Sequence, residues 1–171
     1  MTNHIHLLAT PVDKSAISNT MKVVGSRYAQ YINKKYKRTG TLWEGRHKSS
    51  LVQSDKYFLI CSRYIELNPV AAKMVKSPEE YAWSSYHSNA WGDESWLVPH
   101  EEYMCLGRTQ KKRCRHYREL FKGYIEGDDI ELIRKAINYC QPVGDDRFKQ
   151  QIESKYNIKI GQAKRGRPRK V

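Results

Sequence analysis

The segments that decide the fold are HIHLL at residues 4–8 and KYFLICSRYIELNP at residues 56–69. In the first segment, His4 and His6 alternate with apolar residues. This period of two predicts a short strand with both imidazoles on one face. In the second segment, apolar residues recur at helical spacing, and Pro69 is expected to end or kink the helix. The two patterns together predict an α+β fold.

The predicted helix also aligns a phenol with an amide. Tyr57, Cys61, Tyr64 and Asn68 lie at i, i+4, i+7 and i+11, so they share one face, with Tyr64 and Asn68 one turn apart. A phenol held near a bound cation can attack a phosphodiester and become covalently linked to it. A tyrosine on a helix face also serves commonly as a packing residue, and that alternative stays open.

The histidine pair indicates a metal site. Two imidazoles on one face of a strand can bind a single cation, and the amide of Asn68 would add a third ligand. Water and phosphate would fill the remaining positions, which favours Mg²⁺ or Mn²⁺. Because the His-x-His motif is short, a solvent-facing pair without a metal is the alternative.

The other elements follow from periodicity and from Gly/Pro punctuation. Residues 15–36 predict an amphipathic helix, 41–53 one or two strands, and 70–75 a short third helix. Residues 81–91 are rich in aromatic side chains but have no clear period. After a linker that begins at residue 92, we expect helices over residues 103–125, 128–140 and 145–156, and a basic tail at the end of the chain.

Basic residues are segregated along the chain, whose net charge is +13. Residues 22–48 hold eight Lys/Arg against one acid, residues 108–122 seven against one, and residues 155–171 seven against none. The summed charge of these three clusters exceeds the net charge of the whole chain, so the remaining residues carry a net negative charge. Such segregation favours a polyanionic partner, above all nucleic acid, over a merely solvated surface.

Specific DNA contacts can be proposed within these clusters. Trp43 is suited to stack on an unpaired base, while Arg46 and Lys48 hold phosphates. Burial of Trp43 in a core is the alternative. The predicted helix that follows residue 103 carries three further candidates for phosphate contact: Lys111, Lys112 and Arg113.

The terminal KRGRPRK resembles the core of an AT-hook. Gly166 lets the backbone approach the floor of a narrow minor groove, while Pro168 keeps the chain extended. The side chains expected to contact DNA are those of Arg165, Arg167 and Arg169.

Other classes of protein fit less well. No apolar stretch is long enough to span a membrane, and no secretory signal is evident, so we expect a cytoplasmic protein. The four cysteines show no disulfide spacing. His100, Cys105, Cys114 and His116 fit no common zinc-finger spacing.

Four motifs in order carry a family resemblance: MTNHIHLLATP at 1–11, RTGTLWEGRHKSSLV at 38–52, RYIELNPVAAKMV at 63–75 and YAWSSYHSN at 81–89. GDDRF at 144–148 and the terminal RGRPRK extend it. This pattern closely resembles the REP-associated tyrosine transposases of the HUH (His-hydrophobic-His) nuclease superfamily.

The resemblance implies a ferredoxin-like sheet and a metal-dependent endonuclease and strand transferase. Its substrate would be single-stranded DNA bearing hairpin-forming repetitive palindromes. It implies that His4, His6 and Asn68 bind Mg²⁺ or Mn²⁺, and that Tyr64 is the nucleophile that forms a 5′-phosphotyrosine. The protein would act as a monomer or a homodimer.

In that family a strand, a helix and a neighbouring strand precede the histidine strand, with which this chain begins. We therefore expect an N-terminally truncated gene product or a misassigned start. The predicted layout is a catalytic portion over residues 1–91, a mostly helical region over 92–160 and an AT-hook-like tail over 161–171. A DNA-binding remnant without catalysis is the alternative function, and an RNA-binding module is a third.

Overall fold

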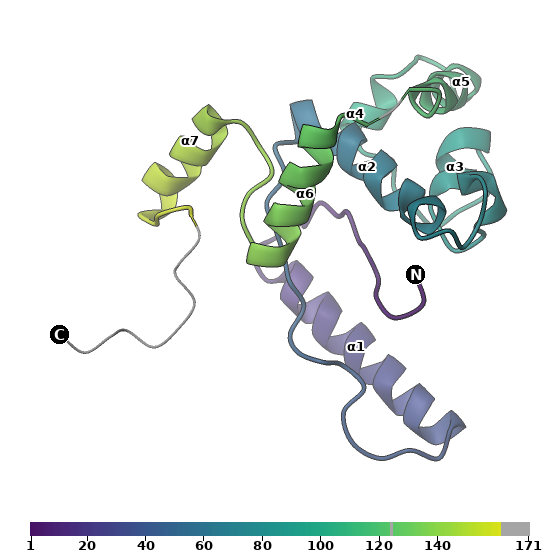
Figure 1. Cartoon of the computed structure of the whole chain (residues 1–171), viewed down its shortest axis with the longest axis vertical. Helices are drawn as coiled ribbons and strands as arrows, with labels where there is room; N and C mark the ends of the chain where they lie inside the picture. Colours follow the sequence, from purple (N-terminus) through teal and green to yellow (C-terminus); the bar gives the residue numbers. More distant parts are fainter. Residues whose placement is uncertain (124, 162–171) are drawn as a thin grey trace. The chain divides into compact units, whose positions relative to one another are not determined.

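The fold is described from a computed structural model, which places residues 1–123 and 125–161. The chain divides into two compact units, one of residues 9–48 and the other of residues 1–8 together with the chain from residue 49 onward. Each unit is described by itself. Helices dominate both units, and Figure 1 labels them along the chain.

The unit of residues 9–48 is built on one long helix, α1 (Ala16–Lys35). This confirms the helix predicted over residues 15–36. The chain turns back after α1: the Asn33 amide donates to the carbonyl of Gly40 over 3.0 Å, and the Trp43 indole donates to the carbonyl of Gly25 over 2.9 Å. Gly40 has φ +92°, a conformation that favours glycine, so this turn depends on it.

The central helix of the second unit is α2 (Ser54–Ala71), in the segment where the sequence predicted a helix. Pro69 lies inside its last turn. Since proline lacks one backbone N–H, only one helical hydrogen bond is lost there, and the helix continues to Ala71. The separate helix predicted over residues 70–75 is therefore wrong, because its first residues belong to α2.

One side of α2 packs against α6 (Gly127–Tyr139), a helix that the sequence predicted. Tyr57 and Cys61 of α2, Ile133 and Ala136 of α6, and Val143 are all buried in this first core cluster. Leu8 and Tyr64 are half-buried at its margin. Burial of each large apolar side chain in this cluster stabilises the contact by roughly 1.5–3 kcal/mol.

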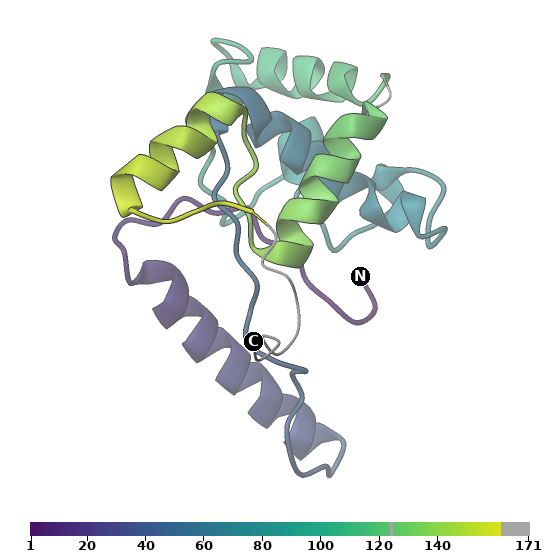
Figure 2. The ribbon, with the colours of Figure 1, turned by 60° about the vertical axis from the view of Figure 1, so that its left-hand side comes forward.

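A second core cluster joins α2 to three short or medium helices, α3 (Tyr86–Trp91), α4 (Glu101–Met104) and α5 (Gln110–Leu120). Its buried members are Tyr86, Ala90, Tyr103 and Tyr117, and Phe58 and Leu59 pack against it from α2. Figure 2 gives a second view of these helices. A single 3₁₀ turn, η1 (Pro78–Glu80), precedes α3.

The single helix predicted over residues 103–125 is wrong, because the chain forms α4 and α5 with a break between them. A Cβ on Gly107 would lie only 2.8 Å from the Cβ of Lys112, so glycine permits a close turn here. The Thr109 hydroxyl then accepts from the Lys112 amide and begins a new helix.

The last described helix is α7 (Asp146–Tyr156), at the predicted position. The Asp145 carboxylate accepts from the Phe148 amide over 2.9 Å and caps it. A Cβ on Gly144 would lie 2.2 Å from the Phe148 ring, so the GDDRF motif combines a cap with a contact that requires glycine.

The predicted ferredoxin-like sheet is contradicted by the structure. Among residues 1–123 and 125–161, the only β pairing is an isolated parallel bridge between Val52 and Val143. Residues 4–8, expected as a strand, are extended but make no backbone hydrogen bond to another described residue. A strand requires a neighbour for its ladder of hydrogen bonds, and no described segment supplies one.

The strands predicted over residues 41–53 are likewise wrong, apart from the bridge at Val52. There the Gln53 amide donates to Val143 O over 2.9 Å, and the Val143 amide donates to Leu51 O over 2.8 Å. Two hydrogen bonds join the segments at one point and do not extend into a ladder. Within the part of the chain that the structure describes, no helix is both long and apolar enough to cross a membrane.

Candidate active site

The histidine pair lies on the extended segment at the start of the chain. The imidazole centroids of His4 and His6 are 4.9 Å apart, with the rings nearly perpendicular at 82°. Nδ1 of His4 donates to Oδ1 of Asn3 over 2.8 Å, which leaves Nε2 of His4 as its free acceptor. His4 is exposed and His6 is half-buried, so the pair borders solvent on one side.

Tyr64 of α2 lies beside His6. Its ring centroid is 6.0 Å from that of His6, in an edge-to-face arrangement at 72°. Tyr57 and Cys61, on the two preceding turns of α2, are buried in the first core cluster. Tyr64 is the next residue on the same helix face and lies at the margin of that cluster. The contact thus joins the start of the chain to the middle of a packed helix.

Asn68 follows Tyr64 by one helical turn, at the end of α2. Its Nδ2 atom is buried and has no hydrogen-bond partner among the residues that the structure places. A buried amide without a partner is costly in a folded protein, and it is a common feature of residues that bind a ligand. Its backbone carbonyl is occupied, since it accepts from the Ala72 amide over 2.9 Å.

The electrostatics around His6 favour a neutral imidazole. Burial is the main cause that lowers the pKa of His6, and the neighbouring His4 and N-terminal ammonium lower it further. A neutral imidazole is the form that binds metal ions. The lowered pKa therefore favours the metal-binding form of the His6 side chain.

The donor set fits a divalent ion. A metal–nitrogen bond of about 2 Å puts an ion roughly 3 Å from each ring centre, so His4 and His6 at 4.9 Å can share one. The third protein ligand would be the side-chain oxygen of Asn68, because its unpartnered Nδ2 atom is a hydrogen-bond donor and does not bind a cation. Residues 1–123 and 125–161 contain no cluster of three or more His, Cys, Asp or Glu side chains with metal-binding geometry. Any site here consequently depends on two imidazoles and an amide.

Glu66 is a residue of α2 that sequence reasoning missed. Its side chain is fully buried and accepts hydrogen bonds from Ser85 Oγ (2.5 Å), Asn89 Nδ2 (3.2 Å) and Tyr117 Oη (2.9 Å). Burial raises the pKa of its carboxyl, although these three donors act in the opposite direction. Glu66 ties α2 to α3 and α5, and the only available signal was one acid inside the apolar run YIELNP.

The predicted phosphate contacts on α5 fall into two groups. Lys111 and Lys112 are exposed, as a phosphate-binding role requires. Arg113 is half-buried, donates to the Gly107 carbonyl over 3.1 Å and lies 6.0 Å from the centre of the Tyr103 ring. Its guanidinium therefore also stabilises the turn between α4 and α5.

The other predicted DNA contacts lie in the unit of residues 9–48 or beyond the described residues. Trp43 is 41% exposed, while Arg46 and Lys48 are exposed on the segment that follows α1. Arg165, Arg167 and Arg169 of the AT-hook-like tail lie outside the described residues.

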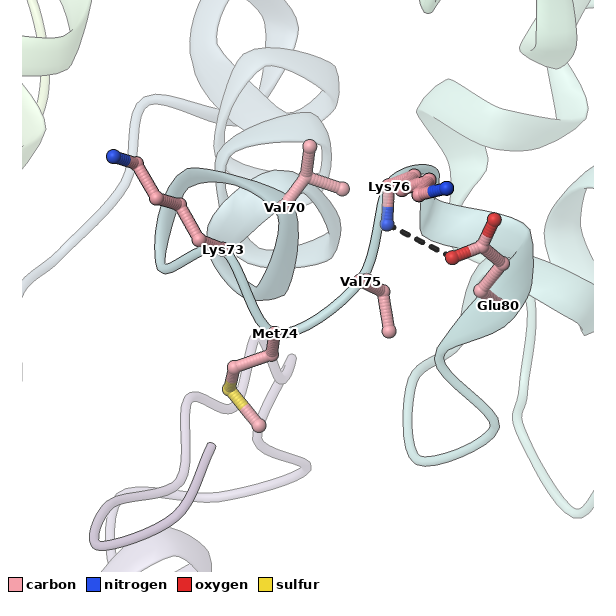
Figure 3. Close-up of a pocket in the computed structure, with 6 residues that line it drawn as sticks. All are labelled: Val70, Lys73, Met74, Val75, Lys76 and Glu80. Carbon is pink, nitrogen blue, oxygen red and sulfur yellow. Dashed lines mark hydrogen bonds between the residues drawn. The ribbon is translucent and has the colours of Figure 1, made fainter.

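A separate hollow of about 590 Å³ lies where α2 ends (Figure 3). The amide of Lys76 donates to the Glu80 carboxylate across its rim over 2.8 Å. Its lining contains none of the predicted site residues and consists of six side chains: Val70, Lys73, Met74, Val75, Lys76 and Glu80.

Comparison with known protein families gives a match over the first part of the chain. Residues 1–68 match the family described as transposase IS200 like. No curated protein and no solved structure matches this chain. The matched segment ends at Asn68 and includes His4, His6 and Tyr64, so it covers every residue of the candidate metal and nucleophile site. The first 68 residues are therefore similar to IS200-like transposases.

Proposed function

We propose that this chain is a metal-dependent endonuclease and strand transferase that acts on single-stranded, hairpin-forming DNA of the REP-associated type. The observation that carries the proposal is the 6.0 Å approach of Tyr64 to His6. Two short motifs that are individually weak lie together within one unit. A packing role alone for Tyr64 would not account for an imidazole of the His-x-His motif at its ring.

In this proposal the Tyr64 hydroxyl is the nucleophile. It loses its proton, its oxygen forms a bond to the phosphorus, and the bond between phosphorus and the 3′ oxygen breaks. The products are a 5′-phosphotyrosine and a 3′ hydroxyl that has taken up a proton. His4, His6 and Asn68 would hold Mg²⁺ or Mn²⁺, which when bound offsets negative charge on the attacked phosphate.

The surrounding residues hold the nucleophile. Tyr57 and Cys61 fix one side of α2 in the first core cluster, and Glu66 fixes the opposite side through Ser85, Asn89 and Tyr117. A helix held on two sides cannot rotate freely about its axis. Tyr64 therefore keeps its direction toward His6 without any contact from DNA.

The direct test is formation of a covalent adduct. The protein is incubated with hairpin-bearing single-stranded DNA and Mn²⁺, then separated on a denaturing gel. We expect labelled DNA to migrate with the protein, and Tyr64→Phe to abolish the adduct while DNA affinity is retained. Tyr57→Phe, two turns earlier on the same helix face, is the matched control and should still form it. An adduct in Tyr64→Phe would refute the proposed nucleophile.

One observation favours a second candidate, a DNA-binding protein without catalysis. Residues 4–8 have no ladder to hold them among the described residues, and Ile5 and Leu7 are 67% and 65% exposed. A histidine pair without that support is fixed less firmly than the nucleophile. The same gel separates the candidates, since this one predicts hairpin binding but no adduct for the unmodified chain.

A further inference from the structure

Three aromatic side chains lie together at the surface of the unit of residues 9–48. The rings of Tyr28 and Tyr31 on α1 are 6.5 Å apart and nearly parallel at 28°. Trp43 joins them at 5.8 Å from Tyr28. The exposed fractions are 46% for Tyr28, 55% for Tyr31 and 41% for Trp43. Each ring therefore contacts another aromatic ring and is also accessible to solvent.

The Trp43 indole fixes one end of this row. Its Nε1 atom donates to the Gly25 carbonyl over 2.9 Å, which satisfies the one polar atom of the ring. No residue of α1 is buried, so these rings do not serve a core within their unit. Neighbouring large aromatic side chains left exposed in this way mark a binding surface more often than isolated ones do.

A lysine lies at the row, and the unit that carries it is rich in basic residues. Nζ of Lys35 donates to the Tyr31 hydroxyl over 3.1 Å and lies 5.4 Å from the centre of the Tyr31 ring. Residues 9–48 contain nine Lys or Arg and two acids. A protein partner that binds by apolar contact would not be served by so many like charges. A polyanion with flat, apolar faces matches both properties.

We propose that Tyr28, Tyr31 and Trp43 form a stacking platform for consecutive unpaired bases of single-stranded DNA, with Lys35 beside it to neutralise phosphate. Duplex DNA offers no free base faces, so the platform selects single strands. The inference rests on the proposed function for its ligand class. It adds Tyr28, Tyr31 and Lys35, which lie outside the proposed catalytic site, to the DNA contacts of this chain.

The test measures binding without catalysis. Fluorescence anisotropy follows a labelled oligothymidine, which forms no hairpin, in EDTA, with a duplex of equal length as the second ligand. We expect Tyr28→Ala and Tyr31→Ala each to weaken binding to the single strand by about tenfold, a typical loss for one stacked base. Duplex affinity should change little. Tyr31→Phe should bind within about twofold of the unmodified protein, because it keeps the ring.

Tyr156 supplies a matched control. It is 57% exposed, and Nζ of Lys155 lies 5.6 Å from its ring centre, much as Lys35 lies beside Tyr31. If Tyr28→Ala and Tyr31→Ala weaken binding no more than Tyr156→Ala does, the platform is wrong. Altered sedimentation with unchanged DNA affinity would assign this face to a second copy of the chain and also overturn it.

Folding is checked by circular dichroism, with Tyr28→Leu and Tyr31→Leu as substitutes if an alanine variant loses helix. Leucine keeps apolar surface but no flat ring, so the same loss of affinity is expected. EDTA removes the divalent metal, so this assay measures binding without metal-dependent cleavage by Tyr64. Failure of the adduct assay would therefore leave this result standing. A failure here would likewise not affect the nucleophile.

Discussion

The imidazole of His6 and the phenol of Tyr64 lie edge to face with their centroids 6.0 Å apart, one on an extended segment and the other on a packed helix. The helix is held by two core clusters, whereas the extended segment makes no backbone hydrogen bond within the described residues. The relationship therefore combines a rigid nucleophile with a more weakly held pair of ligands.

Metal binding should depend on the histidine pair. We expect His4→Ala combined with His6→Ala to weaken Mn²⁺ binding by more than about tenfold, as measured by calorimetric titration. Asn68→Ala should have a smaller effect, because an amide is a weaker ligand. His47→Ala, in the other unit and outside the proposed site, is the control. Unchanged Mn²⁺ affinity in the double variant would remove the metal site.

The buried network at Glu66 should dominate the stability of α2. Glu66→Ala leaves Ser85, Asn89 and Tyr117 without their acceptor, and we expect the free energy of unfolding to fall by about 3–5 kcal/mol. Glu66→Gln keeps one carbonyl oxygen and should cost about half as much. Urea denaturation measures both, with the exposed Glu94→Ala as control. A loss in Glu66→Ala no larger than that control would show that the network is not formed.

The cap of α7 should give a defined pH dependence. The Phe148 amide that donates to Asp145 is the main cause that lowers the pKa of this carboxyl below its usual 3.8. Stability from a carboxyl with a lowered folded pKa is present above its unfolded pKa and disappears as the pH falls through the folded value. We therefore expect the stability difference between the unmodified protein and Asp145→Ala to shrink in acid.

The neighbouring Asp146→Ala is the control, since that side chain is 93% exposed and forms a surface ion pair with Lys149. Thermal melts across the acid range give the comparison. An Asp145→Ala difference that is constant with pH, or equal to that of Asp146→Ala, would contradict the cap.

Thiol reactivity should divide the cysteines into two pairs. Cys105 and Cys140 are exposed, whereas Cys61 and Cys114 are buried, and burial raises the pKa of the Cys61 thiol to about 12. Because the thiolate is the reactive form, we expect iodoacetamide to label only the exposed pair in the native protein. Peptide mass spectrometry identifies the labelled positions. Rapid native labelling of Cys61 would show that the first core cluster is open.

The sequence predicted helices better than the sheet, for a physical reason. The hydrogen bonds of α1, α2, α6 and α7 are local, so the periodicity of the sequence locates these helices. A strand depends on a partner elsewhere in the chain, and the pattern at His4 and His6 contains no information about that partner. The break before α5 depends on how closely Gly107 approaches Lys112, which no local pattern records.

The candidate site shows the same division. Tyr64 and Asn68 share a helix face, so their relation could be read from spacing alone. That His6 meets Tyr64 depends on long-range packing and was expected only from the family resemblance. Glu66 was missed because its partners Ser85 and Tyr117 come from two other helices.

The most direct test of the central claim locates the covalent bond to DNA. The protein is incubated with hairpin-bearing single-stranded DNA and Mn²⁺, and the adduct is digested with nuclease and trypsin. Cleavage after Arg63 and Lys73 releases a peptide whose single tyrosine is Tyr64. Mass spectrometry should find the nucleotide on this peptide and on no other. A nucleotide on the peptide that carries Tyr57, or no nucleotide on any tyrosine, would contradict the assignment of Tyr64 as the nucleophile.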